Sequence, residues 1–292
     1  MGKFYEAIMG LVVGDALGVP YEFRQRDSFE AEGMIGFGTH NQPPGTWSDD
    51  SSMTLATVES LAWRGKVDLE SIMQNFFEWR YFGQFTPHGN VFDIGGTTQR
   101  AIDRYYSGYL PEKCGGRGEM DNGNGSLMRI LPIAFIPNPA DSVHQVSGLT
   151  HAHPISRNAC ELYIAAARVL IFGGKKGAVL NTFRFLDYRQ PFDRLKLLDS
   201  LTRDEIRSSG YVVDTLEAAL WCFLKADSYR ECVLMAVNLG GDTDTIAAVA
   251  GGLAGIYYGI GGDKGIPEEW IDQIVKKDMI KDLCDRFEGV FC

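Results

Sequence analysis

The chain has 292 residues, of which 45% are hydrophobic, so it can bury a sizeable core in a single domain spanning residues 1–292. Its formal net charge of −10 argues against a nucleic-acid partner, because an acidic protein repels the phosphate backbone at a distance. The six cysteines lie far apart, no secretory signal is recognisable before Asp15, and no apolar run reaches the roughly 18 residues of a membrane span. We therefore expect a cytoplasmic protein with reduced thiols and no membrane contact.

Apolar residues recur at helical spacing along most of the chain, and we find no convincing alternating strand. The predicted helices cover residues 3–18, 51–64, 69–82, 97–107, 155–172, 213–225, 229–238 and 246–258, with a helix–loop–helix in 173–210 and one or two helices in 267–289. The predicted fold class is therefore all-α, an orthogonal bundle of many helices whose site is formed by loops at helix ends. Within the first helix, Gly10, Gly14 and Gly18 follow at four-residue spacing, which indicates that another helix approaches closely.

Two acids stand in loops that follow predicted helices. Glu22 comes just after the first helix, and Asp93 precedes a pair of glycines in the loop 83–100. Taken alone, a loop glutamate is most often solvated, and an aspartate before glycines is most often a turn residue or a helix cap. The loop 24–47 is long for a compact domain, which favours a functional role for it.

Two predicted helix starts each carry two carboxylates and one hydroxyl. The six side chains are Ser48, Asp49, Asp50, Asp242, Asp244 and Thr245. If the two starts face each other, six oxygen ligands converge and their four negative charges balance two divalent cations. Ligation by oxygen alone favours Mg2+ or Mn2+ over zinc. The alternative is a pair of well-capped helices with spare aspartates, since acids are common in first turns. In the second stretch Gly240 and Gly241 supply the turn, and Asp242 or Thr243 is the expected N-cap.

Residues 122–126 form an Asn-Gly-Asn-Gly-Ser segment whose exposed N–H groups precede a helix start, as is typical of an anion cradle. Glycine loops are common, so this segment alone is a weak signal. His151 and His153 form a His-x-His pair, but no cysteine or third histidine pairs obviously with them, which weighs against a zinc site.

Five stretches together resemble the motifs of the ADP-ribosylglycohydrolase family, and they occur in the family's order. They are Gly14–Glu22, Trp47–Ser51, Phe92–Thr98, Asn122–Arg129 and Gly240–Thr245. The resemblance covers most of the chain and points to the bacterial branch whose type enzyme removes ADP-ribose from dinitrogenase reductase. One departure is Ser48, where the family more often has threonine, although a serine hydroxyl can still bind a cation.

The resemblance implies metal-dependent hydrolysis of the N-glycosidic bond in an ADP-ribosylated protein or small conjugate, with ADP-ribosyl-arginine favoured. It implies two divalent cations, Mg2+ or Mn2+, among the six ligands, where they would hold the ribose hydroxyls and lower the pKa of a water. Asp93 or Glu22 would orient or deprotonate that water, beside Asp49 and Asp244 of the metal set. The residues implied to contact ADP-ribose are Asn122, Gly123, Asn124, Gly125, Ser126 and His151.

Three alternatives stay open: a hydrolase of ester- or serine-linked ADP-ribose, a two-metal phosphohydrolase, and a non-catalytic relative that binds ADP-ribose. A phosphohydrolase needs cationic groups on the transferring phosphate, and only Arg129 is near a candidate cradle. A non-catalytic relative would have lost ligands, whereas all six are present. The sequence leaves the oligomeric state open, with a monomer favoured.

Overall fold

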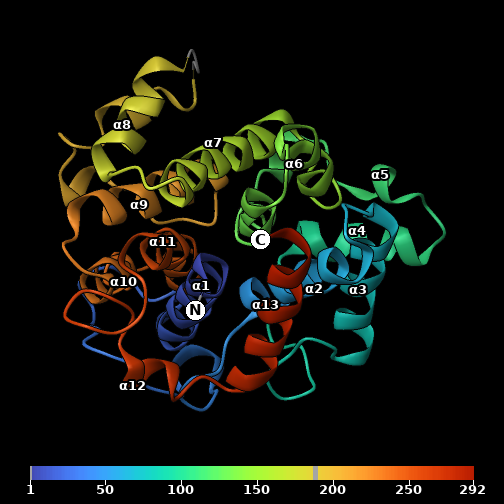
Figure 1. The fold of residues 1–292 in the computed structure, drawn as a ribbon, viewed down its shortest axis with the longest axis horizontal. Coiled ribbons are helices and arrows are strands. Elements are labelled where there is room, and N and C mark those ends of the chain that lie inside the picture. The colour runs from blue at the N-terminus through green and yellow to red at the C-terminus, as the bar shows by residue number, and fades with distance from the viewer. Residues whose placement is uncertain (1, 187–189) are drawn as a thin grey trace.

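The computed structural model describes residues 2–186 and 190–292, and within these ranges the chain forms helices without a β-sheet (Figure 1). The all-α fold class predicted from the helical periodicity is therefore confirmed. The α-helices are α1 Lys3–Gly18, α2 Asp49–Arg64, α3 Leu69–Phe82, α4 Gly96–Tyr106, α5 Pro111–Cys114, α6 Ala140–Ser147, α7 Pro154–Ile171, α8 Lys176–Phe185, α9 Val212–Lys225, α10 Tyr229–Val237, α11 Thr243–Tyr258, α12 Glu268–Ile271 and α13 Lys277–Phe291.

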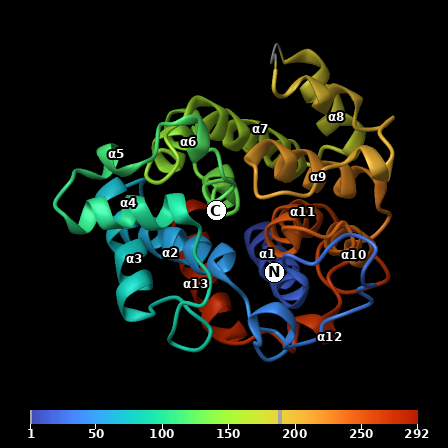
Figure 2. The same cartoon turned by 180° about the vertical axis from the view of Figure 1, so that it is seen from behind.

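The core is organised around α1 and α11, which lie side by side near the middle of the molecule (Figure 1, Figure 2). Helices α9 and α10 pack against α11, while α2 and α13 lie on the other side of α1. Helix α7 runs along the edge of this assembly and packs against α6 and α8. Every residue of α11 from Thr243 to Ile256 is buried, as the apolar residues on all its faces predict.

Glycines let α1 and α11 approach closely. A Cβ atom on Gly14 would lie 2.1 Å from the carbonyl oxygen of Ala247, and one on Gly18 would lie 2.3 Å from the Cα atom of Asp244. No side chain fits within these distances, so the close helix contact predicted from the glycine spacing exists, and its partner is α11. As a consequence, the start of α11 lies against the end of α1, where the acidic residues of both segments can meet.

The predicted helix–loop–helix in 173–210 is wrong in its second half. Helix α8 is present, but after residue 190 the chain forms 3₁₀ turns at Asp193–Leu197 and Arg203–Glu205 in place of a second helix, and residues 187–189 lie outside the described residues. Apolar residues recur at every third position there and all are buried: Phe192, Leu195, Leu198 and Leu201. That spacing matches the three residues per turn of a 3₁₀ helix rather than an α-helix.

The remaining differences concern boundaries. Helix α2 begins at Asp49, two residues before the predicted start at 51, so both of its aspartates lie in its first turn. Helix α6 lies in a segment for which the sequence predicts no element, and Pro139 occupies its N-cap position. The tail contains two helices, α12 and α13, as predicted. None of the helices in the described ranges has the length and hydropathy that crossing a membrane requires.

Candidate active site

The first acidic helix start is fixed by a residue of α1 that the sequence analysis did not assign. Asp15 is fully buried, and its carboxylate accepts hydrogen bonds from the backbone N–H groups of Ser48 and Ser51 at 3.0 Å. Ser48 is the N-cap of α2, and its hydroxyl accepts from the N–H of Asp50 at 3.3 Å. Burial raises the pKa of Asp15 to about 6, against the effect of the Ser51 and Ser48 hydrogen bonds. Asp15 therefore holds the first turn of α2, and with it Asp49, at the end of α1.

The second acidic helix start follows a turn that only glycine adopts readily. Gly240 and Gly241 have φ angles of +69° and +74°, and a Cβ atom on Gly241 would lie 2.2 Å from the carbonyl oxygen of Ser208. Asp242 occupies the N-cap position of α11, but its side chain makes no capping bond. Its Oδ2 atom instead accepts from the Asn124 amide at 2.8 Å, so this aspartate is turned toward the loop 122–126.

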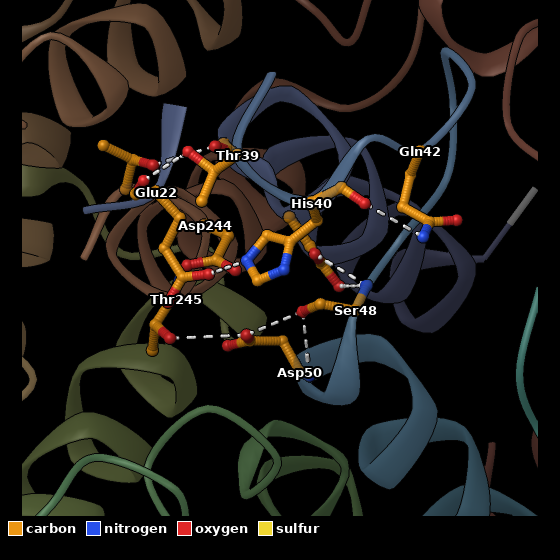
Figure 3. A network of polar contacts seen from close by, with 11 residues as sticks. Glu22, Thr39, His40, Gln42, Ser48, Asp50, Asp244 and Thr245 are labelled. Atoms are coloured by element: carbon orange, nitrogen blue, oxygen red, sulfur yellow. Dashed lines mark hydrogen bonds and ion pairs between the residues drawn. The ribbon is translucent and has the colours of Figure 1, made fainter. Parts of the chain in front are cut away.

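The two helix starts face each other across the end of α1, as Figure 3 shows for Asp50, Asp244 and Thr245. The Thr245 hydroxyl donates to Oδ2 of Asp50 at 3.3 Å. Carboxylate oxygens of Asp15, Asp50 and Asp244 lie within 4.8 Å of one another, and so do those of Glu22, Asp242 and Asp244. Asp244 belongs to both groups, so the structure contains two adjoining carboxylate clusters that share one side chain.

Three carboxylate oxygens in these clusters are buried and have no hydrogen-bond partner among the described residues. They are Oδ1 of Asp50, Oδ1 of Asp242 and Oδ2 of Asp244. Leaving such an oxygen unpaired is costly, and native structures rarely do so. Burial, with further repulsion from nearby carboxylates, raises the pKa of Asp49, Asp50 and Asp244 well above the usual range. The clusters are therefore able to bind metal ions, and their all-oxygen donor set fits hard divalent cations.

Glu22 and Asp93 meet at a histidine that the sequence analysis did not assign. Nε2 of His40 is hydrogen-bonded to Oε2 of Glu22 (Figure 3). A carboxylate oxygen of Asp93 lies within 4.8 Å of both groups. Burial raises the pKa of Glu22 to about 7, against the effect of the His40 hydrogen bond. Burial also raises the pKa of Asp93, while the Glu22 hydrogen bond raises that of His40. His40 lies in the loop 24–47, whose length was the available signal for a functional role.

Glu22 and Asp93 line a cavity of about 300 Å³. Its lining includes the acids Glu22, Asp49, Asp93 and Asp242 and, from a separate segment, the glycines of the loop 122–126 beside His151. Within the described residues, no lysine or arginine lines the cavity. Thr98 also lines the cavity, and its buried hydroxyl has no hydrogen-bond partner among the described residues. The sequence pattern indicated Thr98 only as part of the Phe92–Thr98 motif, without a role of its own.

The loop 122–126 places its glycines against His151. A Cβ atom on Gly125 would lie 2.9 Å from Cε1 of His151, so a side chain at this position cannot fit without movement. The N–H groups of residues 123, 125 and 126 have no acceptor among the described protein atoms, as an anion cradle requires. The side chains of Asn122 and Ser126 point elsewhere: they are hydrogen-bonded to Ser156 and Ser147. These two side chains brace the loop, which leaves backbone groups to face a ligand.

His151 presents a neutral N–H group to this loop. Arg129 donates to the Thr150 hydroxyl at 2.8 Å, and that hydroxyl lies 2.8 Å from Nδ1 of His151. The hydroxyl can accept from Arg129 and donate to Nδ1 at the same time, and this arrangement would leave the ring hydrogen on Nε2. Burial lowers the pKa of His151 to about 3, so the ring is uncharged at neutral pH. Gly123 is adjacent, since a Cβ atom there would lie 3.5 Å from Nε2.

Comparison with known proteins agrees with this geometry. The family model described as ADP-ribosylglycohydrolase matches residues 1–292. The ADP-ribosylarginine hydrolase Tri1 of Pseudomonas putida (strain GB-1) is 35% identical over 290 residues, which cover 96% of this chain and 76% of the relative. The ADP-ribosyl-[dinitrogen reductase] glycohydrolase of Rhodospirillum rubrum is 33% identical over 282 residues, which cover 93% of this chain and 90% of the relative.

A solved structure described as an ADP-ribosylglycohydrolase-related protein complex superposes with a TM-score of 0.83 at 32% identity, covering 99% of this chain and 98% of that one. These matches confirm the resemblance predicted from the five motifs, and with it a hydrolase of ADP-ribosylated substrates as the enzyme class. The chain belongs to the ADP-ribosylglycohydrolase family.

Proposed function

We propose that this enzyme hydrolyses the N-glycosidic bond of ADP-ribosyl-arginine, on a protein or a small conjugate, with two divalent cations of the Mg2+ or Mn2+ type. The observation that carries the metal proposal is the set of three buried, unpaired carboxylate oxygens between the two facing helix starts. The cation ligands we propose are the side chains of Ser48, Asp49, Asp50, Asp242, Asp244 and Thr245. The arginine linkage is supported by relatives at 33–35% identity whose names include ADP-ribosylarginine hydrolase.

The residues that line the cavity have separate proposed roles in breaking the glycosidic bond. When bound, the cations would supply Lewis acidity toward the ribose hydroxyls and toward water. The bond between the ribose anomeric carbon and the guanidine nitrogen breaks, and its electron pair stays on the nitrogen. The surrounding carboxylates stabilise the positive charge that develops on the sugar. The water oxygen bonds to the anomeric carbon, and Glu22 or Asp93 accepts the proton that the water releases and the leaving guanidine takes up.

Glu22 and Asp93 both suit proton transfer, and we leave the choice between them open. The pKa of Glu22, raised to about 7, is near the pH at which a group exchanges a proton most effectively. The His40 hydrogen bond fixes the orientation of the Glu22 carboxylate toward Asp93 and the clusters. Asp49 is near enough to Asp93 for repulsion from Asp93 to raise its pKa, so removing either of the two changes the other.

The loop 122–126, which also lines the cavity, is the proposed pyrophosphate cradle. Its unpaired backbone N–H groups and the neutral Nε2–H group of His151 offer hydrogen bonds without a lysine or arginine. Arg129 does not take this role, because its side chain is fully buried and donates to Val146 and Thr150. The same observation weighs against a phosphohydrolase, which needs a cationic group on the transferring phosphate.

The test is an assay of free ADP-ribose released from arginine-, serine- and acetyl-linked conjugates. We expect turnover of the arginine conjugate with added Mg2+ or Mn2+ and loss of turnover with chelator. Turnover of the serine or acetyl conjugate alone would refute the arginine linkage and leave the hydrolase class intact. No metal dependence in any conjugate would refute the cation proposal.

Other predictions from the sequence remain part of this proposal. We infer one domain over residues 1–292, a cytoplasmic and monomeric protein, and no nucleic-acid partner. The charge of −10 supports the last of these, because the field of the protein repels a polyanion.

A further inference from the structure

Phe23, directly after Glu22, has an unusual backbone conformation at the rim of the cavity. Its φ angle is +64°, in a region of backbone conformation that residues other than glycine seldom adopt. Two backbone hydrogen bonds hold it there: the Phe23 N–H donates to the Gly241 carbonyl at 2.7 Å, and the Gly241 N–H donates to the Arg24 carbonyl at 2.9 Å. Phe23 is thus fastened to the glycine turn that leads into Asp242.

The ring of Phe23 is held out toward the cavity rather than into the core. It is 70% exposed and lines the cavity, although burial is the usual fate of a phenylalanine. Among the described aromatic side chains, the ring of Phe23 contacts that of His40, with 6.1 Å between the ring centroids and 59° between the ring planes. An exposed ring on a strained backbone contributes little to folding. Strain of this kind gathers at sites that bind ligands, so the observation points to a ligand for the ring.

The chemistry of the ligand follows from the groups around the ring. Phe23 is adjacent to Glu22, and His40, which its ring faces, is hydrogen-bonded to that carboxylate with Asp93 beside both. The carboxyl groups of both clusters and Asp93 outnumber the four charges that two divalent cations would carry. An aromatic face beside surplus carboxylates favours a planar cation.

We propose that Phe23 forms the subsite for the leaving group, and that its ring stacks on the guanidinium of the modified arginine. This inference rests on the proposed function, since it assigns the acid end of the cavity to the scissile bond and the loop 122–126 to the pyrophosphate. It adds a residue that selects a cationic leaving group over an uncharged one. The anchor is the backbone pairing with Gly241, which places the ring next to the reacting bond.

The test compares leucine and tyrosine at this position. Phe23→Leu keeps an apolar side chain on an equally strained backbone and removes the aromatic face, whereas Phe23→Tyr keeps it. We expect Phe23→Leu to lower kcat/KM for an arginine-linked conjugate by about fivefold to tenfold and to leave a serine-linked conjugate within about twofold. Phe23→Tyr should stay within about twofold on both. Phe37→Leu is the matched control, because Phe37 has a φ angle of +68°, is 58% exposed and does not line the cavity.

A second readout separates this inference from the proposed function. Agmatine carries the same guanidinium as arginine, and its affinity for the protein saturated with ADP-ribose can be measured by calorimetry. We expect agmatine to bind about fivefold more weakly to Phe23→Leu than to the wild type, with the affinity for ADP-ribose unchanged. Unchanged agmatine affinity, or an equal loss on both conjugates, would overturn the inference. Failure of the wild type to cleave the arginine conjugate would overturn the proposed function, and the agmatine measurement would still decide the role of Phe23.

Discussion

The two sets of residues that line the cavity differ in the groups they offer a ligand: one offers carboxylates and the other offers uncharged donors. The acid wall, made of Glu22, Asp49, Asp93 and Asp242 next to the buried carboxylates, gathers more carboxyl groups than the His40 ring paired with Glu22 can neutralise. The loop wall, made of residues 123–125 and His151, carries no charged side chain and relies on backbone N–H groups and a neutral imidazole. Under the proposed function, the acid wall takes up cations and the loop wall does not.

The proposed function then makes cation binding and ADP-ribose binding separable functions of the same cavity. The walls are joined by Asn124, which lies on the loop and donates to Asp242 of the acid wall at 2.8 Å. That contact keeps the proposed cation site and the loop at a fixed spacing. A mutation in one wall is nevertheless expected to change mainly the binding function of that wall. The predictions below test the separation, beginning with the largest effect.

The largest effect is expected for Asp244→Asn, because Asp244 belongs to both carboxylate clusters. Loss of this charge should lower kcat by on the order of 1,000-fold, comparable to removing a group that stabilises the transition state. Calorimetry on chelator-treated protein should show weakened binding of Mg2+ or Mn2+, with the affinity for ADP-ribose reduced much less. Asp278→Asn, in the first turn of α13, is the matched control. Cation affinity equal to that of the wild type would contradict the shared role of Asp244.

The second-largest effect is expected from removing the cations, which should lower the stability of the folded protein. A ligand that binds only the folded state at 100 times its Kd stabilises that state by about 2.7 kcal/mol. Chelation should therefore lower Tm by several degrees, and adding Mg2+ or Mn2+ should restore it. The Asp244→Asn protein should show a much smaller response, since its clusters hold less charge. A Tm that does not respond to chelator in the wild type would mean that the unpaired oxygens of the acid wall are satisfied in another way.

The acid wall was predictable from the sequence as far as its groups are local. Ser48, Asp49 and Asp50 stand together at one helix start, and the second start repeats the same arrangement, so a pattern in each short stretch reveals the candidate ligands. The facing of the two starts depends on the close contact of α1 with α11, which the spacing of Gly14 and Gly18 indicated without naming the partner. The sequence therefore predicted a set of candidate ligands, and it left their facing geometry conditional on the packing of α1 against α11.

Asp15 and His40 escaped prediction because their roles depend on distant contacts. Asp15 lies within an apolar helix, and its acceptor role toward Ser48, which is 33 residues away, leaves no local pattern. His40 is 18 residues from Glu22, in a loop without periodicity. On the loop wall, the sequence proposed residues 122–126 as a unit and had no means of separating backbone groups that face the cavity from side chains, such as that of Ser126, that brace it.

The loop wall can be broken by filling the space beside His151. Gly125→Val would place its side chain where a Cβ atom already lies 2.9 Å from the imidazole, so the loop must shift. We expect the affinity for ADP-ribose to fall by about 30-fold, roughly 2 kcal/mol, while the Tm increase on adding cations stays as in the wild type. Gly177→Val, where no atom lies within 4 Å of an added Cβ, is the matched control. An unchanged affinity would place the pyrophosphate elsewhere, and a lost cation response would show that the walls are not separable.

The smallest effect concerns the neutral state of His151, which distinguishes the loop wall from the acid wall. Burial lowers the pKa of His151 to about 3, from an ordinary value of 6.5. Between these values the unfolded chain binds a proton that the folded protein does not, so the contribution of His151 to stability is fully present above pH 6.5 and is lost as the pH falls toward 3. From pH 6.5 to pH 5.5 the loss of stability is about 1 kcal/mol.

His151→Gln removes this titration. Over the same pH range, urea denaturation should therefore show that the free energy of unfolding of His151→Gln falls by about 1 kcal/mol less than that of the wild type. The carboxyl groups of the acid wall titrate in both proteins and cancel in the difference, and His144→Gln, at a site that does not line the cavity, is the matched control for the substitution. Equal pH dependence in the wild type and His151→Gln would mean that the imidazole takes up its proton in the folded protein, and the loop wall would then hold the pyrophosphate through a positive charge instead of a neutral donor.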